Sequence, residues 1–270
     1  HPLKYQISAN LSTLKNKVVQ LGFSKDAYIT GNYITELGKE IGKFYGYVYE
    51  GIARTQADLD NHATQQGANV GDCLYKDVSG PDGKPDGKID ENDRVVLGSG
   101  MPKVNFGISA HLEYKGFDLS VSTFGALGYH VSDDIYNSLN SCYGWANKDV
   151  AMADANRWSE DGKTYLSNVP RTYATNNAQQ AWNDLFSSRQ IQNAAYWKIA
   201  NVELGYNMPD KWFGGYVNSV RIYVSAQNLY TFTGYHGYNV DYAGGVWTPG
   251  YNFCSFPTPR TFMCGLHFSF

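Results

Sequence analysis

The clearest pattern in the chain is an alternation of apolar and polar residues over positions 260–270. One side of an extended strand there carries Phe262, Cys264, Leu266, Phe268 and Phe270, and the other carries Thr261, Met263, Gly265, His267 and Ser269. Alternation with a period of two predicts a β-strand with one apolar face. About 9–11 residues also suffice for a tilted strand to cross a bilayer. We therefore predict a membrane-spanning strand that ends on an aromatic residue.

The same alternation predicts five further long strands. We place them at about residues 4–18, 104–114, 117–129, 190–206 and 219–232. In the last of these, Val220, Ile222 and Val224 alternate with more polar residues, and Phe117 and Leu119 do the same in 117–129. We expect these apolar faces to point to lipid.

The segments that connect the predicted strands alternate in length. The short ones are Lys115-Gly116 and 207–218, and the long ones are 19–103, 130–189 and 233–259. Barrels of the bacterial outer membrane have short periplasmic turns and long external loops. The sequence therefore predicts an all-β fold: about six strands of a large antiparallel transmembrane β-barrel, with the long segments as external loops.

Six strands are too few to close a wide barrel, and the chain starts without an export signal. We expect residues 1–270 to be the C-terminal segment of a barrel domain, with the plug and the earlier strands outside it. The alternative is a soluble β-sandwich that serves as a structural or glycan-binding surface domain without transport. In a sandwich the apolar faces pack against one another, whereas in a barrel they face lipid.

Composition narrows the function classes. Charged residues make up 17% of the chain, and no apolar run approaches the ~18 residues of a membrane helix. The net charge of −3 gives no reason to expect nucleic acid as a partner. The six His are scattered, and no Gly-x-Ser-x-Gly or His-Glu-x-x-His motif is present. We therefore expect no enzymatic activity.

Several segments together resemble one family. They are Tyr196–Tyr206 (YWKIANVELGY), Val220–Tyr235 (VRIYVSAQNLYTFTGY), Phe256–Phe262 (FPTPRTF), Gly42–Ile52 (GKFYGYVYEGI), Gly71-Asp72 and Tyr114–Leu119 (YKGFDL). In this order the segments resemble the C-terminal part of SusC-like TonB-dependent transporters.

The resemblance implies a barrel of about 22 strands in the bacterial outer membrane, with an N-terminal plug. It also implies energy supplied by TonB through the missing N-terminal part, and a SusD-like surface lipoprotein as a lid. The substrates of the family are mostly oligosaccharides and in some members peptides. The chain would then supply wall and external loops, in contact with the bilayer and with the remainder of the same barrel.

The acidic segment 77–93 contains the sharpest local motif. Its carboxylates are Asp77, Asp82, Asp86, Asp90 and Asp93. Counted from Asp82, the spacing follows that of an EF-hand loop, with hard oxygen ligands suited to Ca²⁺. Lys84 stands where a ligand is expected, and the last position is Asp rather than Glu. Two interpretations stay open: a Ca²⁺ site, or a turn cluster whose carboxylates accept backbone N–H groups.

Aromatic residues in the predicted external loops are candidates for substrate contact. The tryptophans among them are Trp145, Trp158, Trp182 and Trp247. Flat aromatic faces stack on sugar rings and can anchor peptides. The alternative is that they pack the loops together, contact a lid protein or lie at the membrane interface.

Overall fold

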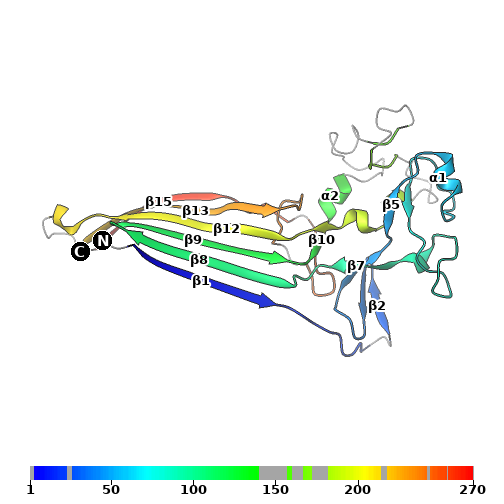
Figure 1. The fold of residues 1–270 in the computed structure, drawn as a ribbon, viewed down its shortest axis with the longest axis horizontal. Helices are drawn as coiled ribbons and strands as arrows, with labels where there is room; N and C mark the ends of the chain where they lie inside the picture. The colour runs from blue at the N-terminus through cyan, green and yellow to red at the C-terminus, as the bar shows by residue number, and fades with distance from the viewer. Residues whose placement is uncertain are drawn as a thin grey trace.

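The computed structural model describes residues 3–22, 26–139, 157–159, 167–171, 182–213, 218–241, 244–253 and 255–269. The molecule is elongated: a long sheet occupies one end and a group of short strands occupies the other (Figure 1). Helix is confined to single turns and two short helices in the described part. None of the described helices is long and apolar enough to cross a membrane.

Six long antiparallel strands form the main sheet. They are β1 (Lys4–Thr13), β8 (Val104–Tyr114), β9 (Phe117–Leu127), β12 (Tyr196–Asn207), β13 (Ser219–Thr233) and β15 (Thr261–Ser269), in the order β1-β8-β9-β12-β13-β15. All six predicted strands are confirmed. The first ends earlier than predicted, at Thr13, and the fourth begins later, at Tyr196. The later start arises because Gln192–Asn193 pairs with a different strand, β10.

The connections at the two ends of the sheet differ as predicted. At one end, Lys115 and Gly116 form a two-residue turn with φ angles of 50° and 88°. Two successive positive φ values are typical of the type I′ turn that joins tightly paired strands. The long connections all leave from the opposite end (Figure 1).

The described parts of the long connections contain strands that the sequence pattern did not predict. Residues 27–99 form what we call the extension: β2 (Ala27–Thr30), β3 (Tyr33–Glu36), β4 (Lys43–Gly46), β5 (Tyr49–Ile52), α1 (Gln56–Asp60), β6 (Cys73–Tyr75), η1 (Glu91–Asp93) and β7 (Val95–Ser99). The sheets are β2-β3-β4-β7 and β5-β6. Strands of three to five residues are too short to show a clear alternation, which is why the pattern missed them.

A third small sheet joins the extension to the main sheet. It contains β11 (Gln192–Asn193), β10 (His130–Asp133) and β14 (Tyr251–Asn252), and β10 is followed by α2 (Asp134–Leu139). Single turns of 3₁₀ helix lie at η4 (Ser188–Gln190), just before β11, and at η5 (Asp210–Trp212), in the short connection at the far end of the main sheet. We call the small sheet, with α2 and the segment 235–241, the junction.

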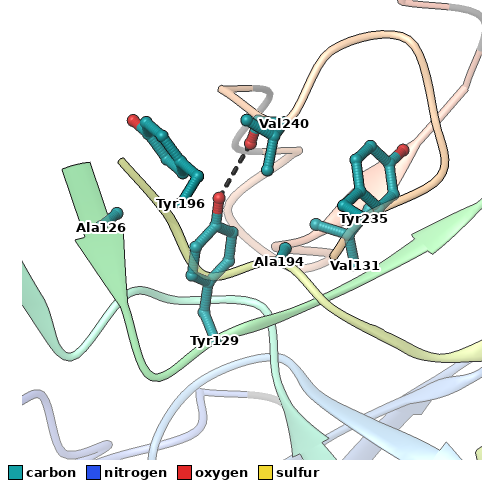
Figure 2. Close-up of a cluster of buried hydrophobic side chains, with 7 residues drawn as sticks. All are labelled: Ala126, Tyr129, Val131, Ala194, Tyr196, Tyr235 and Val240. Atoms are coloured by element: carbon teal, nitrogen blue, oxygen red, sulfur yellow. Dashed lines mark hydrogen bonds between the residues drawn. The ribbon is translucent and has the colours of Figure 1, made fainter. Parts of the chain in front are cut away.

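Buried apolar side chains lie in the junction and the extension. The junction cluster contains Ala126, Tyr129, Val131, Ala194, Tyr196, Tyr235 and Val240 (Figure 2). The extension cluster contains Tyr47, Cys73, Tyr75 and Ile89. Most of the main sheet is outside both clusters, so its stability in this fold depends on what surrounds its two faces.

Candidate functional site

One face of the main sheet is apolar and exposed. A single row across all six strands runs Tyr5, Leu112, Leu119, Leu204, Val224 and Cys264. Val224, Phe117, Leu266 and Ile7 on this face are 51–66% exposed. In the described part of the chain no second sheet packs over it. Exposure on this scale is expected of a surface in contact with lipid and not of a sandwich core.

Val220 is an exception to the predicted lipid face. Its side chain is only 5% exposed. The short connection passes beside it, because the N–H of Met208 donates to the carbonyl of Val220 over 2.9 Å. This end of β13 is therefore covered by protein rather than by lipid.

Aromatic side chains border the apolar face at both ends. Near the long connections, Trp197 stacks on Phe232 with ring centroids 5.4 Å apart, and Tyr230 lies 4.7 Å from Phe232. Near the short turns, Phe117 and Tyr206 lie 4.6 Å apart. Tyr and Trp concentrate where a membrane meets water. The two groups therefore mark the two edges of an apolar band.

The distance between these edges matches an outer-membrane barrel. Trp197 and Tyr206 are nine residues apart on β12, which at about 3.3 Å per residue is about 30 Å along the strand. A tilt of roughly 35–45° reduces that to a height of about 21–25 Å. Apolar bands of outer-membrane barrels are about 25 Å tall.

The opposite face is polar and carries a charged cluster near the short turns. Arg221 Nε donates to Asp118 Oδ2 over 3.0 Å, and Arg221 Nη2 donates to Glu203 Oε1 over 2.7 Å. Asn207 Nδ2 donates to the same Asp118 oxygen over 3.0 Å. The Asp118 side chain is 8% exposed, so the Arg221 charge offsets the cost of removing that carboxylate from water.

A second polar group lies next to the first, toward β1. Lys4 Nζ is 3.2 Å from Glu113 Oε2, and His111 Nε2 is 3.2 Å from Glu113 Oε1. His111 Nδ1 is 2.8 Å from Ser120 Oγ. The charges on this face therefore form networks that extend from β1 to β13, with no comparable group on the apolar face in the described residues.

The segment 235–241 folds over the outer end of the polar face and is fixed there by buried polar contacts. Tyr129 Oη donates to the carbonyl of Val240 over 2.8 Å (Figure 2). Lys198 on β12 pairs with Asp241. Burial raises the pKa of the Tyr129 hydroxyl, so this group stays a neutral donor.

The same segment is also tied to the small sheet of the junction. Tyr235 Oη donates to the buried carboxylate of Asp133, and Asn252 Nδ2 donates to Tyr235 Oη over 2.7 Å. Burial, together with the Asp133 hydrogen bond, raises the pKa of the Tyr235 hydroxyl. A Cβ at Gly237 would lie 2.1 Å from an Asp133 oxygen. Only glycine therefore lets the backbone pass over this pair.

Comparison with known proteins agrees with this arrangement. No family model matches the chain. TonB-dependent receptor P3 of Formosa agariphila is 30% identical over 97% of the chain, and TonB-dependent receptor SusC of Bacteroides thetaiotaomicron is 23% identical over 98%. The chain matches a C-terminal portion of a SusC-like TonB-dependent receptor. It spans about a quarter of these relatives' length, 26% of P3 and 27% of SusC.

Solved structures show the same fold. The structure of the RagAB peptide transporter matches 99% of the chain with a TM-score of 0.76 and 20% sequence identity, over 27% of that longer chain. A second structure of RagAB, as a peptide importer in a "closed-closed" state, matches equally well with a TM-score of 0.76. The main sheet of our SusC-like chain is thus part of a large antiparallel transmembrane β-barrel, as the strand pattern predicted.

The acidic loop of the SusC-like chain uses its carboxylates as acceptors for backbone N–H groups. Asp93 is fully buried, and its Oδ1 accepts from Val78 N over 2.8 Å and Ser79 N over 3.1 Å, while its Oδ2 accepts from Asp90 N over 2.8 Å. The other four predicted ligands, Asp77, Asp82, Asp86 and Asp90, each accept one backbone N–H in the same way. These contacts are those of the turn-cluster interpretation.

No metal-binding group of three or more His, Cys, Asp or Glu side chains is assembled within the described residues. One oxygen in the loop is nevertheless unused: Asp77 Oδ1 is buried and has no hydrogen-bond partner in the described part. The Ca²⁺ site stays a prediction. It requires the carboxylates to turn from backbone N–H groups toward a shared ion.

The four predicted tryptophans lie in different environments. Trp145 is outside the described residues, as is the terminal Phe270. Trp158 is 8% exposed and covers Gly71, where a Cβ would lie 2.5 Å from its ring. Trp182 donates from Nε1 to the carbonyl of Gln66 over 3.0 Å. Trp247 is 41% exposed, the most of the three that are described, and its ring packs edge-on against Tyr28 with centroids 5.4 Å apart.

The partners of Asp72 were not among the residues predicted from the sequence. This fully buried carboxylate accepts from Arg171 Nε over 2.6 Å and Nη2 over 3.0 Å, and from Asn183 Nδ2 over 2.8 Å. We call these three residues the Asp72 clamp. It joins segments that are about 100 residues apart in sequence. The only sequence signal was Gly71-Asp72 itself, one of the segments that resemble the family, and it identifies neither Arg171 nor Asn183 as a partner.

Proposed function

We propose that the receptor to which this chain contributes imports oligosaccharides, or peptides, across the outer membrane with energy from TonB. A SusD-like lipoprotein would cover its external face. The two faces of the main sheet carry this proposal. The apolar face, bordered by two aromatic groups, fits lipid, while the polar face with the Asp118–Arg221–Glu203 cluster fits a wet lumen.

The relatives support transport rather than enzymatic chemistry, because their names describe receptors and a transporter. RagAB is named as a peptide transporter, which supports peptides as one substrate class. The oligosaccharide class is supported by exposed aromatic rings such as Trp247 in the long connections.

Uptake by cells that lack the receptor gene tests the proposal. Deletion mutants should lose growth on one set of oligosaccharides or peptides as the sole carbon source, and the full-length gene should restore it. Removal of TonB should abolish the same growth. A tagged receptor should co-purify with a surface lipoprotein in about a one-to-one ratio.

The alternative, a surface domain without transport, predicts a different result. Cells would then bind a fluorescent glycan at the surface equally well with and without TonB. Growth on every substrate in the panel would be unchanged by the deletion. That pair of results would overturn the importer proposal.

A further inference from the structure

A cavity of about 220 Å³ lies on the outer part of the polar face. Strands β12 and β13, the segment 235–241 and the residues just before β15 line it, and it is partly open to solvent. Its lining includes Lys198, Arg260, Asn228, Thr231, Thr258 and Tyr238. None of the predicted substrate-contact tryptophans is among the residues that line it.

The charged residues in the lining of the cavity are both basic. Two cations line the cavity, and none of its described lining residues is acidic, although the whole chain has a net charge of −3. Lys198 is neutralised by Asp241 and is 4% exposed. Arg260 is exposed and forms no ion pair within the described residues. The cavity thus presents one free guanidinium, which suits a bidentate carboxylate.

The rest of the lining suits a sugar better than a peptide side chain. Thr231 and Thr258 carry hydroxyls that can donate and accept. Asn228 Nδ2 donates to the carbonyl of Pro259 over 3.1 Å, which leaves its amide oxygen as an acceptor. Val240 is the sole aliphatic residue among the described lining residues. Tyr238 is 63% exposed, and its ring can cover one face of a sugar.

The volume fits a ligand portion of about one sugar unit. Pockets for drug-sized ligands are about 300–1,000 Å³, and this cavity is about 220 Å³. It is large enough for one sugar ring and is partly open to solvent, so the remaining units of an oligosaccharide can continue outside it.

We propose that this cavity binds the carboxylated end unit of an acidic oligosaccharide, with Arg260 paired to the uronate carboxylate. The proposal rests on the importer function proposed above and assigns a substrate class to it. Arg260 favours ligands that carry a carboxylate, and the Thr and Asn side chains form hydrogen bonds with the ring hydroxyls.

Calorimetry on the full-length receptor in detergent tests this, with digalacturonate, a β-1,4-linked diglucuronate and their methyl esters as probes. Esterification removes the charge and leaves the rings in place. At least one acid should bind, and its ester should bind about tenfold more weakly or worse. Arg260→Gln should weaken the acid about tenfold and leave the ester unchanged. Arg260→Lys should restore only part of the affinity, because an ammonium keeps the charge and cannot make the bidentate pair.

Lys211→Gln is the matched control, because Lys211 is exposed and lies in the short connection at the other end of the sheet. It should leave all affinities unchanged. The proposal is overturned if neither acid binds, if acid and ester bind equally, or if Arg260→Gln has no effect. Preferential binding of the dipeptide Gly-Glu would also overturn it, in favour of a peptide site.

The two proposals fail separately. If cells still take up an oligosaccharide or peptide through TonB but the purified receptor binds neither acid, only the cavity proposal fails. If acid binding depends on Arg260 but the gene deletion affects no uptake, the cavity proposal stands and the importer function fails.

Discussion

Arg221 and Asp118 form an ion pair across a strand that contains neither of them. Asp118 is on β9 and Arg221 is on β13, with β12 between the two. The pair passes over Gly205, which is the β12 partner of Asp118. A Cβ at Gly205 would lie 2.5 Å from Arg221 Nη2 and 2.6 Å from Asp118 Oδ2. The absence of a side chain at 205 is what allows the contact.

Gly205→Ala should therefore separate this pair and lower the free energy of unfolding by about 1–3 kcal/mol, the cost of leaving a buried polar group poorly satisfied. Urea unfolding of the full-length receptor in lipid vesicles measures this. In a double-mutant cycle with Arg221→Ala, the effect of the alanine at 205 should largely disappear. Additive effects would show that Gly205 has no role in the ion pair.

A charged side chain on the apolar face should destabilise the folded receptor. Ile222→Arg should cost about 2–4 kcal/mol if the residue lies near the midplane of the bilayer. Gln227→Arg is the matched control on the same strand, because Gln227 is on the polar face and is exposed. The fraction of folded receptor in outer membranes and the urea midpoint in vesicles should fall for the first variant only. Equal losses would contradict the assignment of the faces.

The sequence pattern predicted the main sheet well, because alternation over ten or more residues has few explanations. Strand β8 was placed at 104–114 and lies at Val104–Tyr114. The pattern could not predict the contacts that bring distant segments together. Arg171 and Asn183 are ordinary polar residues in sequence, and only the fold brings them to Asp72. The burial of Trp158 against Gly71 could not be predicted either. A tryptophan that packs on a glycine has the same local sequence pattern as one that faces substrate.

The Asp72 clamp should stabilise the extension against local unfolding. Asp72→Asn removes the charge that Arg171 faces in a buried setting, and breaking a buried pair costs about 3–5 kcal/mol. Limited proteolysis of intact receptor should then cut the extension much faster, while the main sheet stays protected in the membrane. Asp60→Asn, an exposed carboxylate on α1, should leave the cutting rate unchanged. If both variants behave like wild type, the clamp does not stabilise the extension.

The acidic loop can be tested for Ca²⁺ without assuming a site. If Ca²⁺ binds, millimolar Ca²⁺ should raise the thermal unfolding temperature of the extension, and Asp77→Asn should abolish that rise because it removes the unused oxygen. Asp93→Asn should lower stability with and without Ca²⁺, since Asp93 accepts three backbone N–H groups. A calorimetric titration with no heat would leave only the turn cluster.

The junction should loosen in mild acid through His130. Burial lowers the pKa of His130 below its usual 6.5, so the folded state favours the neutral ring and the unfolded state binds the proton more readily. The stability that this group provides is fully present above about pH 6.5 and is lost as the pH falls through the lowered pKa. Amide exchange of β10 and β14, corrected for intrinsic rates, should therefore speed up between about pH 7 and 5.

The neighbouring Asp134 works in the opposite direction, which makes the two effects separable. Burial raises the pKa of Asp134, so its contribution is present below its unfolded pKa of about 3.9 and is lost as the pH rises through the raised folded value. His130→Gln should flatten the loss of protection below pH 6.5, because glutamine does not titrate. Asp134→Asn should leave that loss in place and instead increase protection near neutral pH. An unchanged pH profile in the His130 variant would assign the acid sensitivity to another group.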